Sequence, residues 1–204
     1  DLGSTTDLTG LVLWIEPEEY SQPWQLVTFA WLPDEDLIRK EETDRVPYLA
    51  WRESGYLETT PGRAVSRLAV LRKLAKLQSM FDIQLIAFDR WRIEDLQQMA
   101  EDEGIPLPEM VPFGQGYKDM SPALDKFETA LLNGDVVHDG NPILTWNASN
   151  AVTASDEAGN RKLNKAKAIG RIDLMVAAVQ GAGVAIGNQK TVNLDDFINT
   201  PLYA

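Results

Sequence analysis

The sequence predicts an α/β protein built on a mixed β-sheet. Two apolar, strand-like segments come first, and segments with helical periodicity then alternate with short apolar strands up to a C-terminal helix. The 204 residues contain no internal repeat and no low-complexity block, and they suffice for one substantial core. We therefore predict a single domain over residues 1–204, with residues 188–204 as a tail.

The first half of the chain supplies most of the expected strands. The segments rich in Val, Leu, Phe and Trp are typical of buried strands, and the apolar density before Asp89 favours a central strand. Leucines at helical spacing indicate a helix that ends near Gln78. The expected elements are strands over 8–15, 24–32 and 82–88, an extended piece at 56–58, and helices opening at 33–36 and over 47–53 and 64–78.

The second half alternates helices with short strands. Ser121 followed by Pro122 predicts a helix start, and Gly134 a helix end. The segment around residues 156–159 has turn composition between extended flanks, which favours a hairpin. The expected elements are helices over 93–103, 121–133 and 141–151, a strand over 109–113 and a hairpin over 152–163.

A last helix is expected over residues 167–179, ended by Gly181, Gly183 and Gly187. Its apolar positions recur at three- and four-residue steps, at Ile169, Ile172, Met175, Val176 and Val179. Asp173 lies inside this apolar run, where a carboxylate is costly unless something compensates its charge. A bound metal ion would do so. A salt bridge to a neighbour such as Arg171, or a position at the edge of the core, would do so equally well.

The composition limits the chemistry. The chain has no cysteine and a single histidine, His138, so thiolate and His-rich metal sites are excluded. His138 lies in a segment with loop composition, and a turn or hydrogen-bonding role is favoured over that of a general base. Any bound metal must have oxygen ligands, which points to magnesium, manganese or calcium.

The net charge of −12 argues against non-specific binding to a polyanion, yet one segment differs from this average. Residues 158–172 contain no acid, and they carry Arg161, Lys162, Lys165, Lys167 and Arg171. This segment is interpreted either as a DNA-backbone contact or as an ordinary exposed hairpin. No apolar run reaches the roughly 18 residues of a membrane span, and there is no signal peptide, so we expect neither a membrane protein nor a secreted one.

Carboxylates are the candidate ligands. Asp89 follows a predicted central strand, where α/β proteins bind ligands, although an N-cap for the next helix explains it equally well. Asp1 and the weaker candidate Asp7 flank a Gly-Ser-Thr-Thr turn, and a frayed terminus or a turn explains them as well. Carboxylates that converge without a cation repel one another, so a converging cluster suits two divalent ions of the kind that hydrolyse phosphodiesters.

Five segments together resemble the nuclease domain of the large terminase subunits of tailed phages. They occur in that family's order between Asp1 and Gly183, and they are residues 1–10, 114–124, 138–142, 146–150 and 167–173. The resemblance implies a ribonuclease H-like fold with a five-stranded mixed sheet ordered 3-2-1-4-5 and helices on both faces. It also implies that a strand outside these 204 residues leads into Asp1.

The resemblance further implies a metal-dependent endonuclease that cuts concatemeric double-stranded DNA during viral genome packaging. Carried over by position, Asp1, Asp89 and Asp173 would be the catalytic ligands of two Mg²⁺ or Mn²⁺ ions. Lys167 matches the family's lysine six residues before the last acid, and it would contact DNA phosphate, steady the site or remain a solvated cation. Arg161, Lys162, Lys165 and Arg171 would hold the DNA backbone beside the metals.

The implied partners are double-stranded DNA, an ATPase domain of the same parent chain, the small terminase subunit and the portal protein. This chain lacks the phosphate-binding loop of an ATPase. We expect a monomer in isolation, a ring in the assembled motor, and a location in the cytoplasm of the infected bacterium. Two alternatives remain open: a non-catalytic docking module of the packaging machine, and a related nuclease of the junction resolvase or transposase type.

Overall fold

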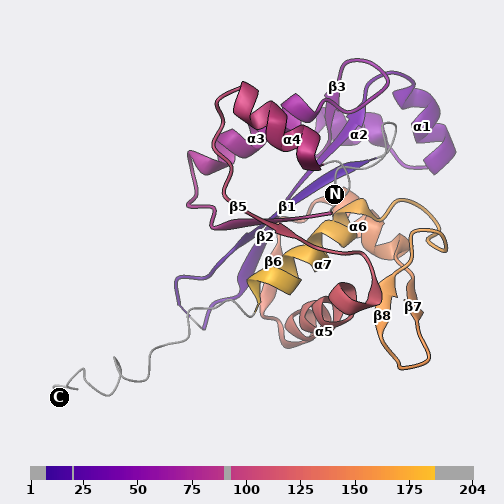
Figure 1. The fold of residues 1–204 in the computed structure, drawn as a ribbon. Helices are drawn as coiled ribbons and strands as arrows, with labels where there is room; N and C mark the ends of the chain where they lie inside the picture. Colours follow the sequence, from indigo (N-terminus) through magenta and orange to yellow (C-terminus); the bar gives the residue numbers. More distant parts are fainter. Residues whose placement is uncertain (1–7, 20, 90–92, 187–204) are drawn as a thin grey trace.

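The structure is a computed structural model that describes residues 8–19, 21–89 and 93–186 (Figure 1). It is an α/β arrangement in which α3 and α4 lie on one side of the central strands and α5 and α7 on the other (Figure 1). No helix in these ranges is both long enough and apolar enough to cross a membrane. The elements are β1 (Thr9–Ile15), β2 (Trp24–Pro33), α1 (Leu37–Asp44), α2 (Tyr48–Glu53), β3 (Glu58–Thr60), α3 (Arg67–Gln78), β4 (Leu85–Phe88), α4 (Ile93–Asp102), β5 (Glu109–Pro112), α5 (Tyr117–Asn133), β6 (Val136–His138), α6 (Pro142–Asn150), β7 (Thr153–Ser155), β8 (Arg161–Leu163) and α7 (Asp173–Ala185).

The strands form a mixed sheet and two separate pairs. β2 pairs antiparallel with β1 and parallel with both β3 and β6, while β4 pairs parallel with β5 and β7 with β8 as a hairpin. The mixed sheet is as predicted, and β6 is an additional strand that ends at His138. Within the described ranges no ladder joins β1 to β4, so the five-stranded order 3-2-1-4-5 stays a prediction.

The helix start expected at residue 141 is confirmed, since Asn141 caps α6 and Pro142 lies in its first turn. The helix expected over 64–78 begins later, at Arg67, where the Ser66 side chain accepts a hydrogen bond from the Ala69 backbone. The expected start of α5 was wrong. That helix begins at Tyr117, not after Ser121, because the buried Ser121 hydroxyl is used elsewhere: it accepts a hydrogen bond from the Arg161 backbone at 3.0 Å.

The expected bounds of the last helix were also wrong. Residues 165–167 form a turn, residues 168–172 are not helical, and α7 begins at Asp173; Ile169, which we placed on the buried face, is 86% exposed. Gly181 and Gly183 do not end the helix but lie within it. Their missing side chains leave room for neighbours, because a Cβ atom on Gly181 would lie 2.3 Å from the Trp14 indole and one on Gly183 would lie 2.7 Å from the Phe113 ring.

α7 packs tightly along β1. A Cβ on Gly10 would lie 3.0 Å from the Leu174 side chain, so the first turn of α7 closely approaches the start of β1. Further along, the Trp14 indole donates a hydrogen bond to the Ala178 carbonyl at 3.2 Å. The same indole meets Trp24 and Phe127 edge-on, with ring centroids 6.0 Å apart in both pairs. Trp14 is therefore held by contacts on several sides.

We predict that Gly181→Ala lowers the free energy of unfolding by up to about 2 kcal/mol. Alanine gains roughly 1 kcal/mol of helix propensity over glycine, but overpacking against a constrained indole costs about 1–3 kcal/mol. Urea denaturation measures the change. The Trp14→Phe background serves as the control, because the smaller ring should relieve part of the clash. An increase in stability in the Trp14 protein would contradict the packing argument.

Candidate functional site

Asp173 is the first residue of α7, and its carboxylate is almost completely buried. The side chain is 4% exposed, and its Oδ1 lies 2.9 Å from the Lys165 ammonium. The sequence left a salt bridge to Arg171 open; the partner seen here is Lys165. The buried Asn147 fixes the start of the helix, since its side-chain oxygen accepts a hydrogen bond from the Leu174 backbone at 2.9 Å. The helix dipole adds to the stabilisation of a negative charge at this end.

Asp89 follows the last residue of β4 and is half-buried. Its Oδ2 accepts a hydrogen bond of 2.6 Å from the side-chain amide of Gln115, which comes from the segment between β5 and α5. The bond fixes the orientation of the carboxylate. Gln115 was missed as a site residue, and its only signal was its place in the Gln-Gly segment of the family resemblance. The alternative of an N-cap for α4 involves residues 90–92, which lie outside the described residues.

Asp89 shares an open hollow of about 540 Å³ with two cations, Lys118 and Lys162. The Lys162 ammonium lies 4.8 Å from the centre of the Tyr117 ring, a cation–π contact at the start of α5. The floor of the hollow is ordered by Asp119, whose side chain accepts a hydrogen bond from the Gly114 backbone at 3.0 Å. The fold thus brings a predicted metal ligand and a predicted DNA contact to one surface depression.

Arg171 is held by a carboxylate far away in the sequence. Its Nε lies 2.8 Å from Asp44 Oδ2, and both side chains are 19% exposed. The Tyr48 hydroxyl donates to the same oxygen at 2.7 Å. Burial raises the pKa of Tyr48, so the phenol stays protonated as a donor. These contacts tie the segment before α7 to α1 and α2, a structural role that the sequence did not reveal.

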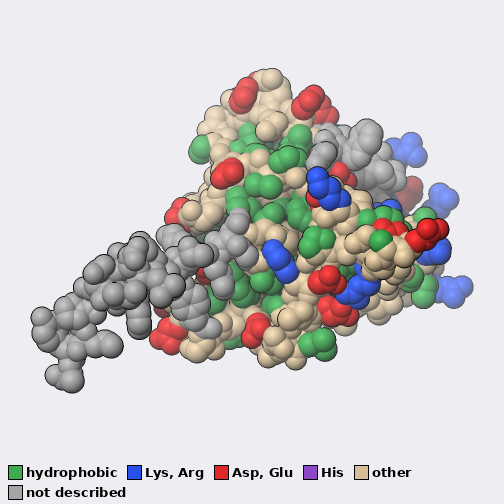
Figure 2. Space-filling model, turned by 60° about the horizontal axis from the view of Figure 1, so that its bottom comes forward, with side chains coloured by type: hydrophobic (Ala, Val, Ile, Leu, Met, Phe, Trp, Pro, Cys, Tyr) green, Lys and Arg blue, Asp and Glu red, His purple; other side chains and the backbone are tan. Residues whose placement is uncertain are grey.

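Arg161 is likewise engaged within the protein. Its guanidinium lies 2.5 Å from Asp125 and 2.7 Å from Glu128, both on α5, and these carboxylates raise the pKa of Arg161. Lys167, in contrast, is exposed, and no ion pair of its ammonium is found within the described part of the chain. Figure 2 shows Lys and Arg side chains next to Asp and Glu on the face it presents, with no continuous basic surface.

Asp1 and Asp7 lie outside the described residues, so the predicted trio of Asp1, Asp89 and Asp173 stays a prediction. Within residues 8–19, 21–89 and 93–186, no three acidic or histidine side chains gather closely enough to hold a metal ion. His138 accepts a hydrogen bond from the Gly140 backbone at 3.1 Å, which matches the turn role favoured from the sequence.

Comparison with known proteins identifies the family to which this chain belongs. Residues 1–187 match the family model described as the endonuclease domain of the terminase large subunit. The chain belongs to this family.

Two curated proteins are similar to this chain in sequence. The large terminase subunit of Enterobacteria phage HK97 is 45% identical over 204 residues, which are 99% of this chain and 40% of that protein. Protein YmfN of Escherichia coli K12 is 27% identical over 176 residues, covering 83% of this chain and 38% of the relative. The chain therefore spans about 40% of the length of the curated relatives that it matches.

A solved structure confirms the arrangement of the elements. The crystal structure of the HK97 large terminase superimposes with a TM-score of 0.85 at 45% sequence identity. The match covers 91% of this chain and 38% of the other. The α/β architecture described above is therefore that of a solved terminase.

We predict that Asp44→Ala lowers the free energy of unfolding by about 2–4 kcal/mol, because it removes the carboxylate that lies 2.8 Å from the largely buried Arg171 guanidinium. Tyr48→Phe serves as the matched control. It removes only one hydrogen bond to the same carboxylate and should cost about 1 kcal/mol. Chemical denaturation of the three proteins measures both values, and equal costs would contradict a buried ion pair at Arg171.

Proposed function

We propose that this domain is a metal-dependent DNA endonuclease that cuts concatemeric double-stranded DNA during viral genome packaging. The family match over residues 1–187 carries the proposal. The almost completely buried Asp173 carboxylate, paired with Lys165, supports it, since a buried acid needs a cation beside it. In the longer protein, an ATPase domain, the small terminase subunit and the portal would bring and position the DNA.

The chemistry of the donors fits a divalent metal. Asp89 and Asp173 offer hard carboxylate oxygens, which suit Mg²⁺ or Mn²⁺. We propose that these two residues, with Asp1, would hold two such ions. The ions would supply an activated water and neutralise the charge on the leaving oxygen. Gln115 donates to one oxygen of Asp89 and thereby orients the carboxylate, as partners of metal ligands do.

The lysines would then act on the DNA backbone. Lys165 neutralises Asp173 in the structure, and it would give up this contact when the carboxylate binds a metal ion. Its side chain is 41% exposed, and we propose that it would contact a DNA phosphate. Lys167 is exposed on the same segment, and Lys162 faces the hollow that contains Asp89. We assign the phosphate contacts to these three lysines, because Lys165 and Lys167 are exposed and Lys162 lines the hollow, whereas Arg161 and Arg171 pair with carboxylates of other elements.

We predict that Asp89→Asn and Asp173→Asn each lower Mn²⁺-dependent plasmid cleavage by at least about a hundredfold, since removal of a ligand should cost more than the 10–100-fold typical of its supporting partners. Glu103→Gln, at an exposed acid on the turn after α4, is the control and should retain full activity. Calorimetry with Mn²⁺ alone gives a second readout. Unchanged Mn²⁺ affinity and unchanged cleavage in both variants would favour a non-catalytic docking module.

We also predict that Lys167→Gln reduces the salt dependence of DNA binding. Removal of one phosphate contact should lower the slope of log K against log [salt] by about 0.9 on duplex DNA. Arg161→Gln is the matched control, because its charge already pairs with Asp125 and Glu128 and should leave the slope nearly unchanged. Fluorescence anisotropy between low and moderate salt measures both slopes. Equal changes in the two variants would contradict the assignment.

A further inference from the structure

Two buried asparagines of α6 lie against the segment that carries Asp173. Asn147 is completely buried, and Asn150 is 7% exposed. Their spacing of three residues places both on one side of the helix, and α6 packs beside α7 (Figure 1). Asparagine side chains are mostly exposed in folded proteins, so two buried ones on the same side of a short helix require an explanation.

The two side chains hold the backbone on both sides of Asp173. Asn147 accepts a hydrogen bond from the Leu174 backbone at 2.9 Å, directly after the acid. Asn150 donates one to the Arg171 carbonyl at 3.1 Å, two residues before it. Because both bonds come from α6, this helix fixes the position and the direction of the chain at the point where the carboxylate leaves it.

The bond from Asn147 replaces a cap that the sequence of α7 does not supply. The N-cap residue of α7 is Ile172, whose side chain cannot accept a hydrogen bond. Asn147 provides the acceptor from another helix. A Ser or Asp at the N-cap position would satisfy the backbone of α7 equally well, but it would not tie the first turn to α6. The observed arrangement therefore adds a positional constraint that an ordinary cap lacks.

Asn147 is not the residue that stability alone would favour at this position. Its Nδ2 is buried, and no hydrogen-bond acceptor for it is found within residues 8–19, 21–89 and 93–186. A buried donor without an acceptor destabilises the folded state. Natural sequences break local rules of this kind mainly at functional sites, where position matters more than stability. The asparagine is thus better explained by what its oxygen holds in place.

The contact of Asn150 depends on a glycine opposite it. A Cβ on Gly170 would lie 2.7 Å from Asn150 Nδ2, the atom that donates to the Arg171 carbonyl. Gly170 is not among the glycines with a positive φ, so its backbone conformation does not require glycine. The close approach of the asparagine does. Gly170 therefore gives a way to disturb this contact without changing either asparagine.

We propose that Asn147 and Asn150 are positioning residues for Asp173, which hold its carboxylate in the orientation that binds a divalent ion. The inference rests on the proposed function, since it takes Asp173 as a metal ligand. Neither asparagine is assigned a contact with the ion, because both side chains are directed to backbone groups. Residues that orient a metal ligand in this way typically change metal affinity about 10–100-fold.

Calorimetry with Mn²⁺ on the full-length protein tests the positioning role, and Asp173→Asn defines which binding belongs to the site. Asn147→Ala and Asn150→Ala should each weaken this binding by about 10–100-fold. The displaced carboxylate is still present in both variants. Raised Mn²⁺ should therefore restore much of their plasmid cleavage, whereas Asp173→Asn should stay inactive at any Mn²⁺ concentration.

Asn141→Ala is the matched control. Asn141 is a buried asparagine of the same segment, and its side chain caps α6 by accepting a hydrogen bond from the Ile143 backbone. Its replacement should lower the melting temperature by a few degrees and leave Mn²⁺ affinity unchanged. Equal losses of Mn²⁺ affinity in Asn141→Ala and Asn147→Ala would overturn the proposal, because they would show a general loosening of α6.

Gly170→Ala is an independent variant that leaves both asparagines in place. It should push Asn150 away from the Arg171 carbonyl and weaken Mn²⁺ binding in the same direction as Asn150→Ala. Unchanged affinity in both of these variants would rule out the role of Asn150.

The same measurements separate this inference from the proposed function. If Asp173→Asn alters Mn²⁺ binding while Asn147→Ala and Asn150→Ala do not, the positioning role is wrong and the nuclease proposal stands. If Asp173→Asn leaves Mn²⁺ binding unchanged, Asp173 is not a metal ligand, and both proposals fail.

Discussion

The close packing of α7 on β1 is the contact on which the rest of the structure depends. It requires small residues at both ends, with Gly10 beneath Leu174 and Gly181 beneath the Trp14 indole. Because the helix approaches so closely, its first turn brings Asp173 into the interior beside the start of β1. The burial of the Asp173 carboxylate is thus a consequence of the close packing of α7 on β1. The cost of burial is offset locally by Lys165 and by the helix dipole.

On the face shown in Figure 2, positive side chains lie beside acidic ones and do not form a continuous basic surface. The net charge of −12 is unfavourable for a protein that binds DNA, yet this average conceals how the positive side chains are arranged. Arg171 and Arg161 are paired with Asp44 and with the acids of α5, and they fix the segment between the hairpin and α7 at both ends. Lys167, between them, is left exposed on a segment of defined conformation. The two paired arginines therefore flank the segment that carries this exposed lysine.

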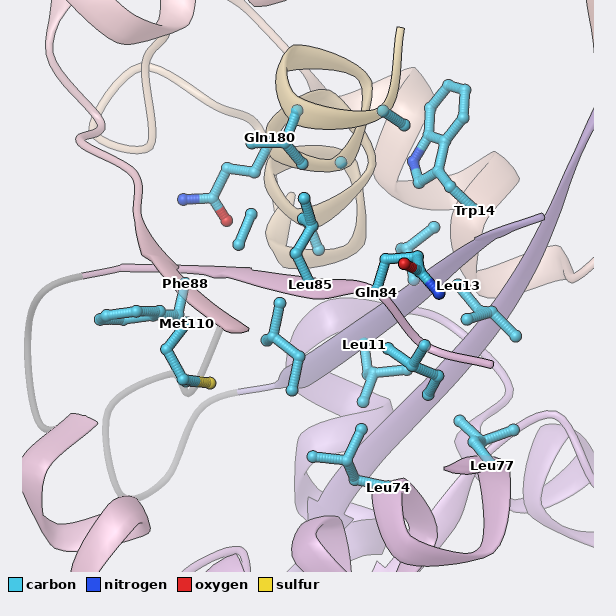
Figure 3. A pocket seen from close by; sticks show the side chains of 18 of the residues that line it. Leu11, Leu13, Trp14, Leu74, Leu77, Gln84, Leu85, Phe88, Met110 and Gln180 are labelled. Atoms are coloured by element: carbon cyan, nitrogen blue, oxygen red, sulfur yellow. The ribbon is translucent and has the colours of Figure 1, made fainter. Parts of the chain in front are cut away.

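The hydrophobic core is divided in the same place as the sheet. One cluster joins α5 and α7 to β1 and β2, whereas Leu71 of α3 and Leu96 of α4 belong to a separate cluster. An apolar cleft of about 470 Å³ between β1 and β4 lies between these clusters, and Leu74 of α3 and Gln180 of α7 line it from opposite sides (Figure 3).

The sequence alone determined the α/β class, most element positions, the helix start at Asn141, and oxygen ligands for any metal, since these depend on local periodicity and composition. Only the tertiary structure decided the true start of α7, the packing role of Gly181, the carboxylate partners of the arginines and the contact of Gln115 with Asp89. Each of these depends on a residue distant in sequence: Gly181 meets Trp14, and Arg171 meets Asp44. Local sequence patterns predict which residues prefer burial or a turn. They do not predict which side chain, distant in sequence, will pack against or pair with each of them.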